Sequence, residues 1–482
     1  MKPEELLDLD ATRLSRLIAA RDISCRALME ATLARIDALN PRFNAIVSLR
    51  DRQQSIDEAI ERDAQLARGE RRGWMHGFPL AVKDLSHAAG LPTSMGSPLS
   101  PRTPAADDSL HVARMRAAGA IVIGKTNTPE FGLGSHTYNT VFGTTRNAFD
   151  ERQSAGGSSG GAAVALALRM LPVADGSDMG GSLRNPAAFN NVIGMRPSRG
   201  RVPGAPGDDL FFQQLGTEGP MARTVEDAAR LLAVQAGHDP RLPLSLTDAL
   251  PAPDDLRIEG ETKGLRIGWL GSLWPDLPLD PGVRELCVRA LDTFRTLGCA
   301  VEPCQLDVSR EQNWSAWLRL RQLSVGGKLG ALMDAPQLRD KVKPEAQWEI
   351  AQSRLLNAAA LYEASMFRSN VFRAFSRLFE RFDFVVAPTA QVFPFDAGLD
   401  WPKSVGGVAS DTYHRWMEIV TPLTLAGLPT LNLRAGFNEG GLPMGLQIAG
   451  PAQADLAVLR LGHAYDLACG WRDVRPPVLR ER

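Results

Sequence analysis

The spacing of apolar residues changes repeatedly along this chain, and each change predicts a helix or a strand. Over residues 3–70 apolar side chains recur at helical spacing between charged ones, which predicts a group of N-terminal helices. Asn40-Pro41 predicts a break between two of these helices, because proline lacks the backbone N–H that a helix needs. We expect the helices to form a layer on one face of a sheet.

The next part of the chain alternates between strand and helix patterns. A strand is predicted at 78–83, a helix at 110–118 and a second strand at 120–124. The apolar run Ala162–Leu171 is long enough for a buried helix. Strand, helix and strand in succession are typical of α/β architecture.

The C-terminal half repeats this alternation after a proline-rich, linker-like stretch at 239–263. Its patterns predict helices at 281–297, 309–380 and 453–468. They predict strands at 265–269, 383–387, 427–433 and 442–448, and a further strand that begins at Val301. We therefore expect one domain over 1–482, made of N-terminal helices (1–70), a core (71–238), the linker-like segment and a remainder (264–482) with a helical insert at 309–380.

Composition narrows the classes of function. The net charge of −1 and the pI near 6.7 give no electrostatic reason to expect nucleic acid or membrane binding. The N-terminus lacks an apolar signal-peptide core, and no window approaches the roughly 18 consecutive apolar residues of a membrane span. Five cysteines without a C-x-x-C pair favour reduced thiols, so we expect a cytoplasmic protein. Scattered histidines without H-E-x-x-H give no reason to expect a metal.

Candidate chemistry is densest between residues 156 and 182. Gly156-Gly-Ser-Ser-Gly-Gly161 precedes the predicted buried helix, and Gly176-Ser-Asp-Met-Gly-Gly-Ser182 follows a short strand pattern. Glycine turns let the main chain approach a ligand closely, and successive N–H groups in such a turn can converge on an anion. A serine directly after the turn could attack a carbonyl carbon while these N–H groups hold the resulting oxyanion.

Lys83 is a candidate base for this serine. It ends the predicted strand at 78–83, in an apolar and glycine-rich setting that favours the neutral amine. The pKa of a free lysine is about 10.4, and the pKa of a fully buried lysine can fall to about 5–6. A buried Lys83 could therefore accept a proton from a serine.

These segments, together with Arg184-Asn-Pro-Ala, resemble the amidase signature family, whose hydrolytic machinery is a Ser–cis-Ser–Lys triad. The sequence separations between the three groups agree with that family. The resemblance implies Ser182 as the nucleophile, Ser158 as the bridging serine with a cis peptide bond, and Lys83 as the base. It further implies an α/β fold with a large central mixed twisted sheet covered by helices on both faces, and an oxyanion hole made of the N–H groups of Met179, Gly180, Gly181 and Ser182.

Two other interpretations of the Gly-Ser stretch fit less well. A phosphate-binding loop would need a following Gly-Lys-Ser/Thr, which is missing from the sequence. Gly156-x-Ser158-x-Gly160 also fits the nucleophile elbow of an α/β-hydrolase, in which Ser158 would attack. That fold needs a hydrophobic strand just before the elbow, and residues 147–154 are not one. It also needs a late histidine, for which His414 and His463 are available.

The neighbouring side chains have separate expected roles. Asp178 and Arg184 flank the Gly-Gly-Ser turn and are expected to form an ion pair that fixes it, with Ser159 as further support. The aromatic residues at 309–380 are expected mostly in the core. Because pockets are lined mainly by apolar and aromatic groups, the candidate substrate contacts are Gly132, Tyr138, Phe211, Phe212, Trp314, Trp317 and Phe367.

The resemblance implies a hydrolase that cleaves the C–N bond of carboxylic amides through an acyl-enzyme on Ser182, without a cofactor. Aryl esters and carbamates suit the same serine attack. The expected partner is a small-molecule amide, bulky and apolar or aryl, and a homodimer is implied by the family. The alternative is the glutamine-hydrolysing A-type subunit of a tRNA amidotransferase, with a non-catalytic scaffold third. Against the amidotransferase, Tyr138 stands where an acidic residue is expected and Leu85 where asparagine is expected.

Overall fold

The computed structural model describes residues 2–204, 209–212 and 215–480, and its central feature is an eight-stranded mixed sheet. The strand order is β4 (Val173–Asp178), β6 (Thr217–Ala222), β5 (Ile193–Arg196), β12 (Thr430–Phe437), β13 (Pro443–Ala449), β9 (Phe384–Pro388), β7 (Arg266–Trp269) and β8 (Ala300–Pro303). The pairs β9–β7 and β7–β8 are parallel, and the other neighbours are antiparallel. The predicted α/β fold with a large mixed sheet is confirmed.

Two of the predicted strands belong to a second, smaller sheet. β2 (Pro79–Lys83) runs parallel to β3 (Ile121–Thr126), which pairs on its other side with the short β1 (Ile46–Val47). β2 also packs beside β4 of the large sheet. The end of β2 is therefore brought to the edge of the large sheet, where both glycine-rich segments lie.

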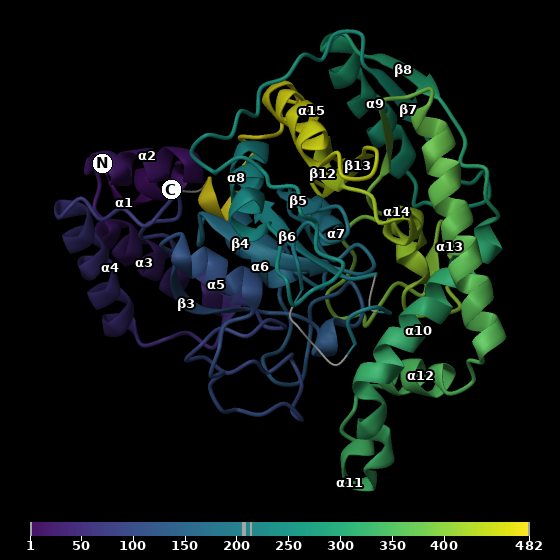
Figure 1. The fold of residues 1–482 in the computed structure, drawn as a ribbon, viewed down its shortest axis with the longest axis horizontal. Coiled ribbons are helices and arrows are strands. Elements are labelled where there is room, and N and C mark those ends of the chain that lie inside the picture. Colours follow the sequence, from purple (N-terminus) through teal and green to yellow (C-terminus); the bar gives the residue numbers. More distant parts are fainter. Residues whose placement is uncertain (1, 205–208, 213–214, 481–482) are drawn as a thin grey trace.

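Helices cover both faces of the large sheet, as predicted (Figure 1). α8 (Val225–Gln235), α9 (Val283–Thr296) and α15 (Asp455–Ala468) pack on one face, and α7 (Arg184–Phe189) packs on the other. Alternation along β12 explains this division. Leu431 and Leu433 lie against Gly462 of α15, whereas the intervening Asn432 points to the side of α7.

The N-terminal helices cover the small sheet rather than the large one. They are α1 (Pro3–Asp8), α2 (Ala11–Ala20), α3 (Cys25–Phe43) and α4 (Arg52–Ala67). α3 packs on β2, α4 on β3 and α2 on α8. The predicted break at Asn40-Pro41 is wrong, because α3 continues through Pro41 to Phe43 and ends at Asn44 in the left-handed region, φ 50°. Proline in the last turn removes only one hydrogen bond close to the helix end.

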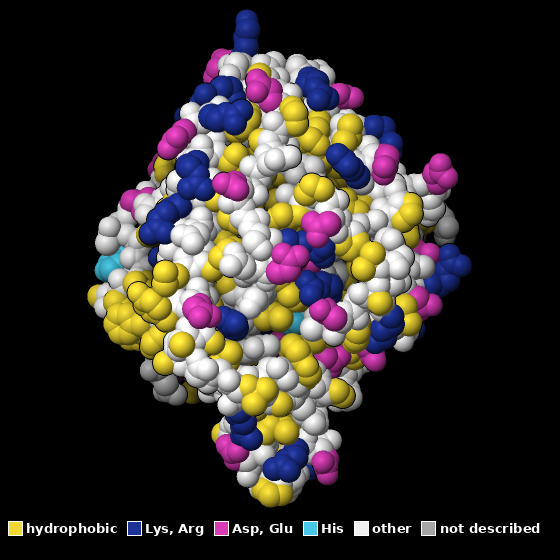
Figure 2. Space-filling model, turned by 90° about the vertical axis from the view of Figure 1, so that its right-hand side faces the viewer, with side chains coloured by type: hydrophobic (Ala, Val, Ile, Leu, Met, Phe, Trp, Pro, Cys, Tyr) yellow, Lys and Arg dark blue, Asp and Glu magenta, His cyan; other side chains and the backbone are white. Residues whose placement is uncertain are grey.

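A helical layer follows β8 in the sequence and matches the predicted insert. It consists of α10 (Arg310–Asp334), α11 (Pro336–Arg339), α12 (Pro344–Ser353) and α13 (Ala358–Phe379), joined later by α14 (Thr421–Ala426). The face that carries these helices mixes basic and acidic side chains without a large area of one sign (Figure 2). This mixture agrees with the net charge of −1.

The remaining elements are short: α5 (Leu110–Ala117), α6 (Gly160–Ala167), β10 (Ser404–Val405), β11 (Val408–Ala409) and the 3₁₀ turns Glu130–Gly132, Arg415–Val420 and Pro477–Leu479. α5 packs on α8, and α6 packs on β4 and β6. All five cysteines are free thiols. Among the described residues, no helix is both long and apolar enough to cross a membrane.

Candidate active site

The first glycine-rich turn leads into α6, a helix that is buried on all sides. A Cβ on Gly161 would lie 2.4 Å from the backbone nitrogen of Asn127, so only glycine permits this close packing. Ser159 occupies the position just before the helix. The peptide bond before Ser158 is cis, as the family resemblance implied. The turn thus presents two adjacent serine hydroxyls at the start of a buried helix.

Lys83 ends β2 with its amine among three serine hydroxyls. Its Nζ lies 2.8 Å from Ser158 Oγ, 2.8 Å from Ser159 Oγ and 2.9 Å from Ser177 Oγ. The Lys83 side chain is fully buried. A neutral amine has one lone pair and two N–H donors, so one of these hydroxyls can direct its hydrogen at the nitrogen. The geometry therefore suits a proton transfer between Ser158 and Lys83.

Burial lowers the pKa of Lys83 to about 8, because the charged ammonium loses its hydration. The nearby carboxyl groups of Glu218, Asp175 and Asp178 oppose this effect. A substantial fraction of Lys83 is therefore neutral in mildly alkaline solution, where it can act as a base.

Asp175 ties the small sheet to the large one at this point. Its Oδ1 accepts the backbone N–H of Lys83 at 3.0 Å, and its Oδ2 lies 3.3 Å from Nε2 of His111 on α5. His111 and Asp175 are both buried. The end of β2, and with it the direction of the Lys83 side chain, is thus fixed against β4.

Ser182 lies in the second glycine-rich turn, between the end of β4 and the start of α7. It lines the same cavity as Ser158, and its carbonyl accepts the N–H of Ser159 at 3.3 Å. The described residues give no hydrogen bond between the Ser158 and Ser182 hydroxyls. Such contacts in active sites often tighten only when substrate is bound.

The N–H groups of this turn divide into two kinds. The Gly181 N–H donates to Asp178 Oδ1 at 3.0 Å, so it serves the turn itself rather than an oxyanion, contrary to expectation. The N–H groups of Met179, Gly180 and Ser182 have no acceptor among the described residues. Three of the four expected donors are therefore available to an oxyanion.

Asp178 and Arg184 form the predicted ion pair, and Arg196 joins it. Arg184 donates to both carboxylate oxygens of Asp178, at 3.0 and 3.1 Å, and Arg196 lies 3.3 Å from one of them. All three side chains are fully buried. Burial raises the pKa of Asp178, but the two guanidinium groups outweigh it and hold the pKa well below its usual range. The turn that carries Ser182 is therefore built on a buried ionic cluster.

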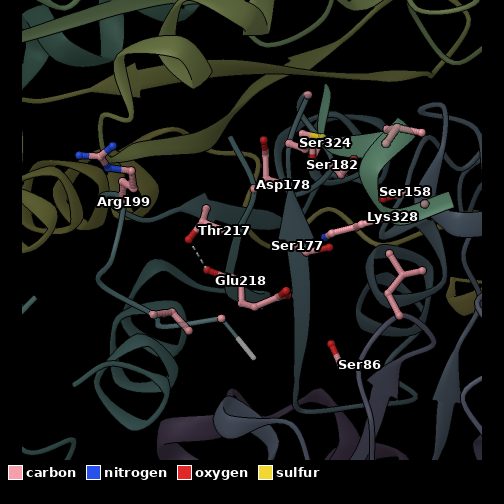
Figure 3. Close-up of a pocket in the computed structure, with 18 of the residues that line it drawn as sticks. Ser86, Ser158, Ser177, Asp178, Ser182, Arg199, Thr217, Glu218, Ser324 and Lys328 are labelled. Atoms are coloured by element: carbon pink, nitrogen blue, oxygen red, sulfur yellow. Dashed lines mark hydrogen bonds between the residues drawn. The ribbon is translucent and has the colours of Figure 1, made fainter. Parts of the chain in front are cut away.

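The two serines open into a cavity of about 650 Å³ (Figure 3). Gly132, one of the expected contacts, lies on its wall, and a Cβ there would be 2.7 Å from Leu85 and 3.6 Å from Ser158 Oγ. Much of the remaining wall is apolar and includes Leu85, Met95, Phe131, Leu133, Val325, Leu329 and Met417. The space suits a molecule with a sizeable apolar part.

Trp317 and Trp314 do not line this cavity, contrary to expectation. Trp317 is fully buried behind the second turn, where its indole N–H donates to Met179 O at 3.3 Å. Trp314 stacks on Trp317 with ring centroids 5.1 Å apart. Trp317 therefore supports the turn directly, and Trp314 packs behind it, between Trp317, His414 and Arg415.

The other aromatic candidates also lie elsewhere. Tyr138 faces a neighbouring cleft, where its hydroxyl donates to Glu345 at 3.1 Å. Phe367 packs against the hydrophobic core from α13. Phe211 and Phe212 are exposed, next to residues 205–208 and 213–214 outside the described part of the chain. Sequence proximity to the signature did not place these rings at the site.

Several functional candidates were missed from the sequence. Ser177 contacts the Lys83 amine, and Glu218 and His111 line the cavity, as does Lys328 of α10. Ser177 stands two residues beyond Asp175 on β4, so strand alternation could have placed both on the Lys83 side. Glu218 carries no comparable signal, because its place depends on the pairing of β6 with β4.

No cluster of metal-ligating side chains occurs in the described part of the chain. The arrangement instead offers a buried amine, a chain of hydroxyls and free backbone donors, the groups needed for acyl transfer through a serine.

Comparisons with known proteins agree with this chemistry. A family model described as Amidase matches residues 27–459. An acylamidase of Rhodococcus erythropolis is 33% identical over 484 residues, covering 99% of this chain and 98% of that protein. The A-type subunit of the glutamyl-tRNA(Gln) amidotransferase of Acidothermus cellulolyticus is 34% identical over 492 residues, covering 96% and 95%.

Solved structures show the same similarity. A bacterial aryl acylamidase of the amidase signature family superposes with a TM-score of 0.89 at 30% identity, covering 97% of this chain and 99% of the other. A 6-aminohexanoate cyclic dimer hydrolase complexed with substrate superposes with a TM-score of 0.85 at 26% identity, covering 98% and 99%.

Proposed function

Since the chain belongs to the amidase signature family, we propose that it hydrolyses carboxylic amides through an acyl-enzyme on Ser182. The observation that supports this most directly is the buried Lys83 amine, 2.8 Å from Ser158 Oγ. Ser158 and Ser182 line the same cavity, and Ser182 O accepts the N–H of Ser159 at 3.3 Å, so the nucleophile lies beside the pair of serines that contacts the base.

In this mechanism, neutral Lys83 takes the proton of Ser158 as Ser158 takes the proton of Ser182. The Ser182 oxygen attacks the amide carbon, and the resulting oxyanion accepts hydrogen bonds from N–H groups of the 179–182 turn. The C–N bond then breaks as the proton returns through Ser158 to the leaving amine. Water repeats the route, releases the carboxylic acid and restores Ser182.

We infer an apolar or aryl amide as the substrate class. The apolar cavity wall supports this inference, whereas the tryptophans of α10 do not, because they lie behind the turn. The similarity to an acylamidase and to an aryl acylamidase points the same way. Aryl esters and carbamates present the same kind of carbonyl carbon to Ser182 and belong in the same substrate panel.

A second candidate is an A-type amidotransferase subunit that hydrolyses glutamine for a partner. Several relatives favour it, among them the Acidothermus cellulolyticus subunit, which is 34% identical over 96% of this chain. Leu85 remains an argument against it, since it contributes an apolar side chain to the cavity wall where asparagine is expected. Tyr138 also differs from the expected acidic residue, but it faces a neighbouring cleft and not this cavity.

One assay separates the two candidates. The purified chain is incubated alone with an anilide, an alkyl amide, an aryl ester, a carbamate and glutamine, and intact-mass and peptide analysis locates the acylated residue. Hydrolysis of the anilide with acyl mass on Ser182 supports the amidase. Activity confined to glutamine, or an acyl group on Ser158, contradicts it.

A further inference from the structure

Glu218 of β6 lies directly across from Ser177 of β4, so the two side chains share one face of the sheet. Figure 3 shows its carboxyl group directed toward the strand that carries Ser177. Ser177 in turn contacts the Lys83 amine at 2.9 Å. A carboxyl group therefore lies next to the hydroxyls that hold Lys83.

This carboxyl group lacks a hydrogen-bond donor on one oxygen. Oε2 of Glu218 is buried and has no partner in the part of the chain that the structure describes. A buried polar atom without a partner destabilises a fold, and the effect is larger when the atom is charged. Packing alone therefore does not account for a glutamate at this position.

The charged and titratable groups around Glu218 come from four elements. They are Lys83 on β2, His111 on α5, Asp175 on β4 and Lys328 on α10. Burial raises the pKa of Glu218, and the cationic forms of His111 and Lys83 oppose that shift. Among the charges that act on Lys83, Glu218 exerts the largest effect, ahead of Asp175 and Asp178.

This ordering has a chemical consequence for the base. A fully buried lysine without an anion nearby falls to a pKa of about 5–6, and such an amine is a weak base. The pKa of Lys83 instead falls only to about 8. A base with a pKa near the working pH combines a usable neutral fraction with a strong affinity for the proton.

We propose that Glu218 is a positioning residue that acts through Lys83, whose protonation it controls by its charge. The inference rests on the proposed role of Lys83 as the base. The carboxylate keeps the buried amine basic enough to take the Ser158 proton. It also stabilises the ammonium that exists while the oxyanion is present.

The test is the dependence of kcat/KM on pH for Glu218→Gln, measured with an uncharged anilide. Glutamine keeps the shape of the side chain and removes the charge. In the native enzyme kcat/KM should rise with pH as Lys83 loses its proton (the acid limb) and then reach a plateau. In Glu218→Gln we expect this acid limb to lie roughly one pH unit lower, because the amine loses its proton more readily. The plateau value of kcat/KM should fall severalfold, because a less basic amine is a poorer proton acceptor. Glu218→Asp, which restores a carboxylate, should return the limb toward its original position.

Two further variants keep the result interpretable. Glu302→Gln removes one carboxylate from β8, at the opposite edge of the same sheet, and should leave the limb unchanged. Glu218→Met fills a similar volume without charge and replaces Glu218→Gln if that variant does not fold. An uncharged variant whose acid limb superimposes on that of the native enzyme overturns the proposal. Absence of anilide hydrolysis by the native chain, or full activity in Ser182→Ala, instead contradicts the proposed function.

Discussion

Trp317 donates its indole N–H to the carbonyl of Met179 across 3.3 Å, although 138 residues separate the two in the sequence. The same ring lies against the next residue of the turn, since a Cβ on Gly180 would be 2.9 Å from Trp317 Cζ2. A rigid aromatic wall therefore sets the position of backbone N–H groups that face the reacting carbonyl in the proposed mechanism.

The first prediction concerns Gly180→Ala. The added methyl group would meet the Trp317 ring and shift the turn, so kcat for the anilide should fall by about 10²-fold, the effect typical of losing one oxyanion donor. KM should change much less. Gly327→Ala on α10 is the matched control, because a Cβ there meets nothing within 4 Å. Equal kcat values for the two variants would contradict a role for the turn.

The second prediction is an acid limb in kcat/KM that belongs to Lys83. Burial lowers the pKa of Lys83 to about 8, so the ammonium predominates at lower pH and the base is lost. The rate should rise with pH through this value and then level off. Lys83→Met should abolish the limb and most of the activity, whereas the exposed Lys263→Met should keep both. A native profile that is flat between about pH 6 and about pH 9 would exclude Lys83 as the base.

The third prediction is an order of effect on turnover when each of three serines is replaced by alanine. Ser182→Ala should remove turnover, by a factor of at least about 10⁴, because no acyl-enzyme can form. Ser158→Ala should leave a measurable remainder, since a water molecule can occupy the space of the lost hydroxyl. Ser177→Ala, which removes only one contact to the Lys83 amine, should have the smallest effect. Steady-state assays and mass analysis for the acyl group measure all three, and an acylated Ser182→Ala variant would refute the assignment.

The fourth prediction is a loss of stability in Asp178→Asn. The change leaves Arg184 and Arg196 buried without their anion, which should lower the free energy of unfolding by about 3–5 kcal/mol. Because the pKa of Asp178 is held below its usual range, this stabilisation is complete above about pH 4 and is lost as the solution becomes more acidic. Denaturant unfolding at neutral pH measures it.

Asp292→Asn is the control for that measurement. Asp292 pairs with Arg295 on the exposed surface of α9, and such pairs contribute little, so its effect should stay within about 0.5 kcal/mol. If Asp178→Asn were as stable as this control, the buried cluster would not hold the turn.

Local patterns were enough to predict most helices and strands, and the family resemblance supplied the candidate catalytic groups. Apolar spacing is a local property, so it located helices such as α9 and strands such as β9 to within a few residues. The two glycine-rich turns could be recognised for the same reason, since glycine permits backbone conformations closed to other residues. Lys83 was a candidate from its place at the end of an apolar strand, and its role as the base came from the resemblance to the amidase signature family. The prediction at Pro41 was wrong because the effect of a proline depends on its position within the helix. Pro41 lies in the last turn of α3, and the sequence did not show where that helix ends.

Which of these groups come into contact depends on how distant elements pack in three dimensions. The partition into two sheets, the placement of Glu218 across from Ser177, and the turning of Trp317 behind Met179 follow from strand pairing and from which helix faces pack. These contacts join segments that are distant in the sequence. They are stabilised by the burial of side chains and by the register of paired strands, and not by the conformational preferences of neighbouring residues. A side chain's neighbours across a sheet cannot be read from its neighbours along the chain.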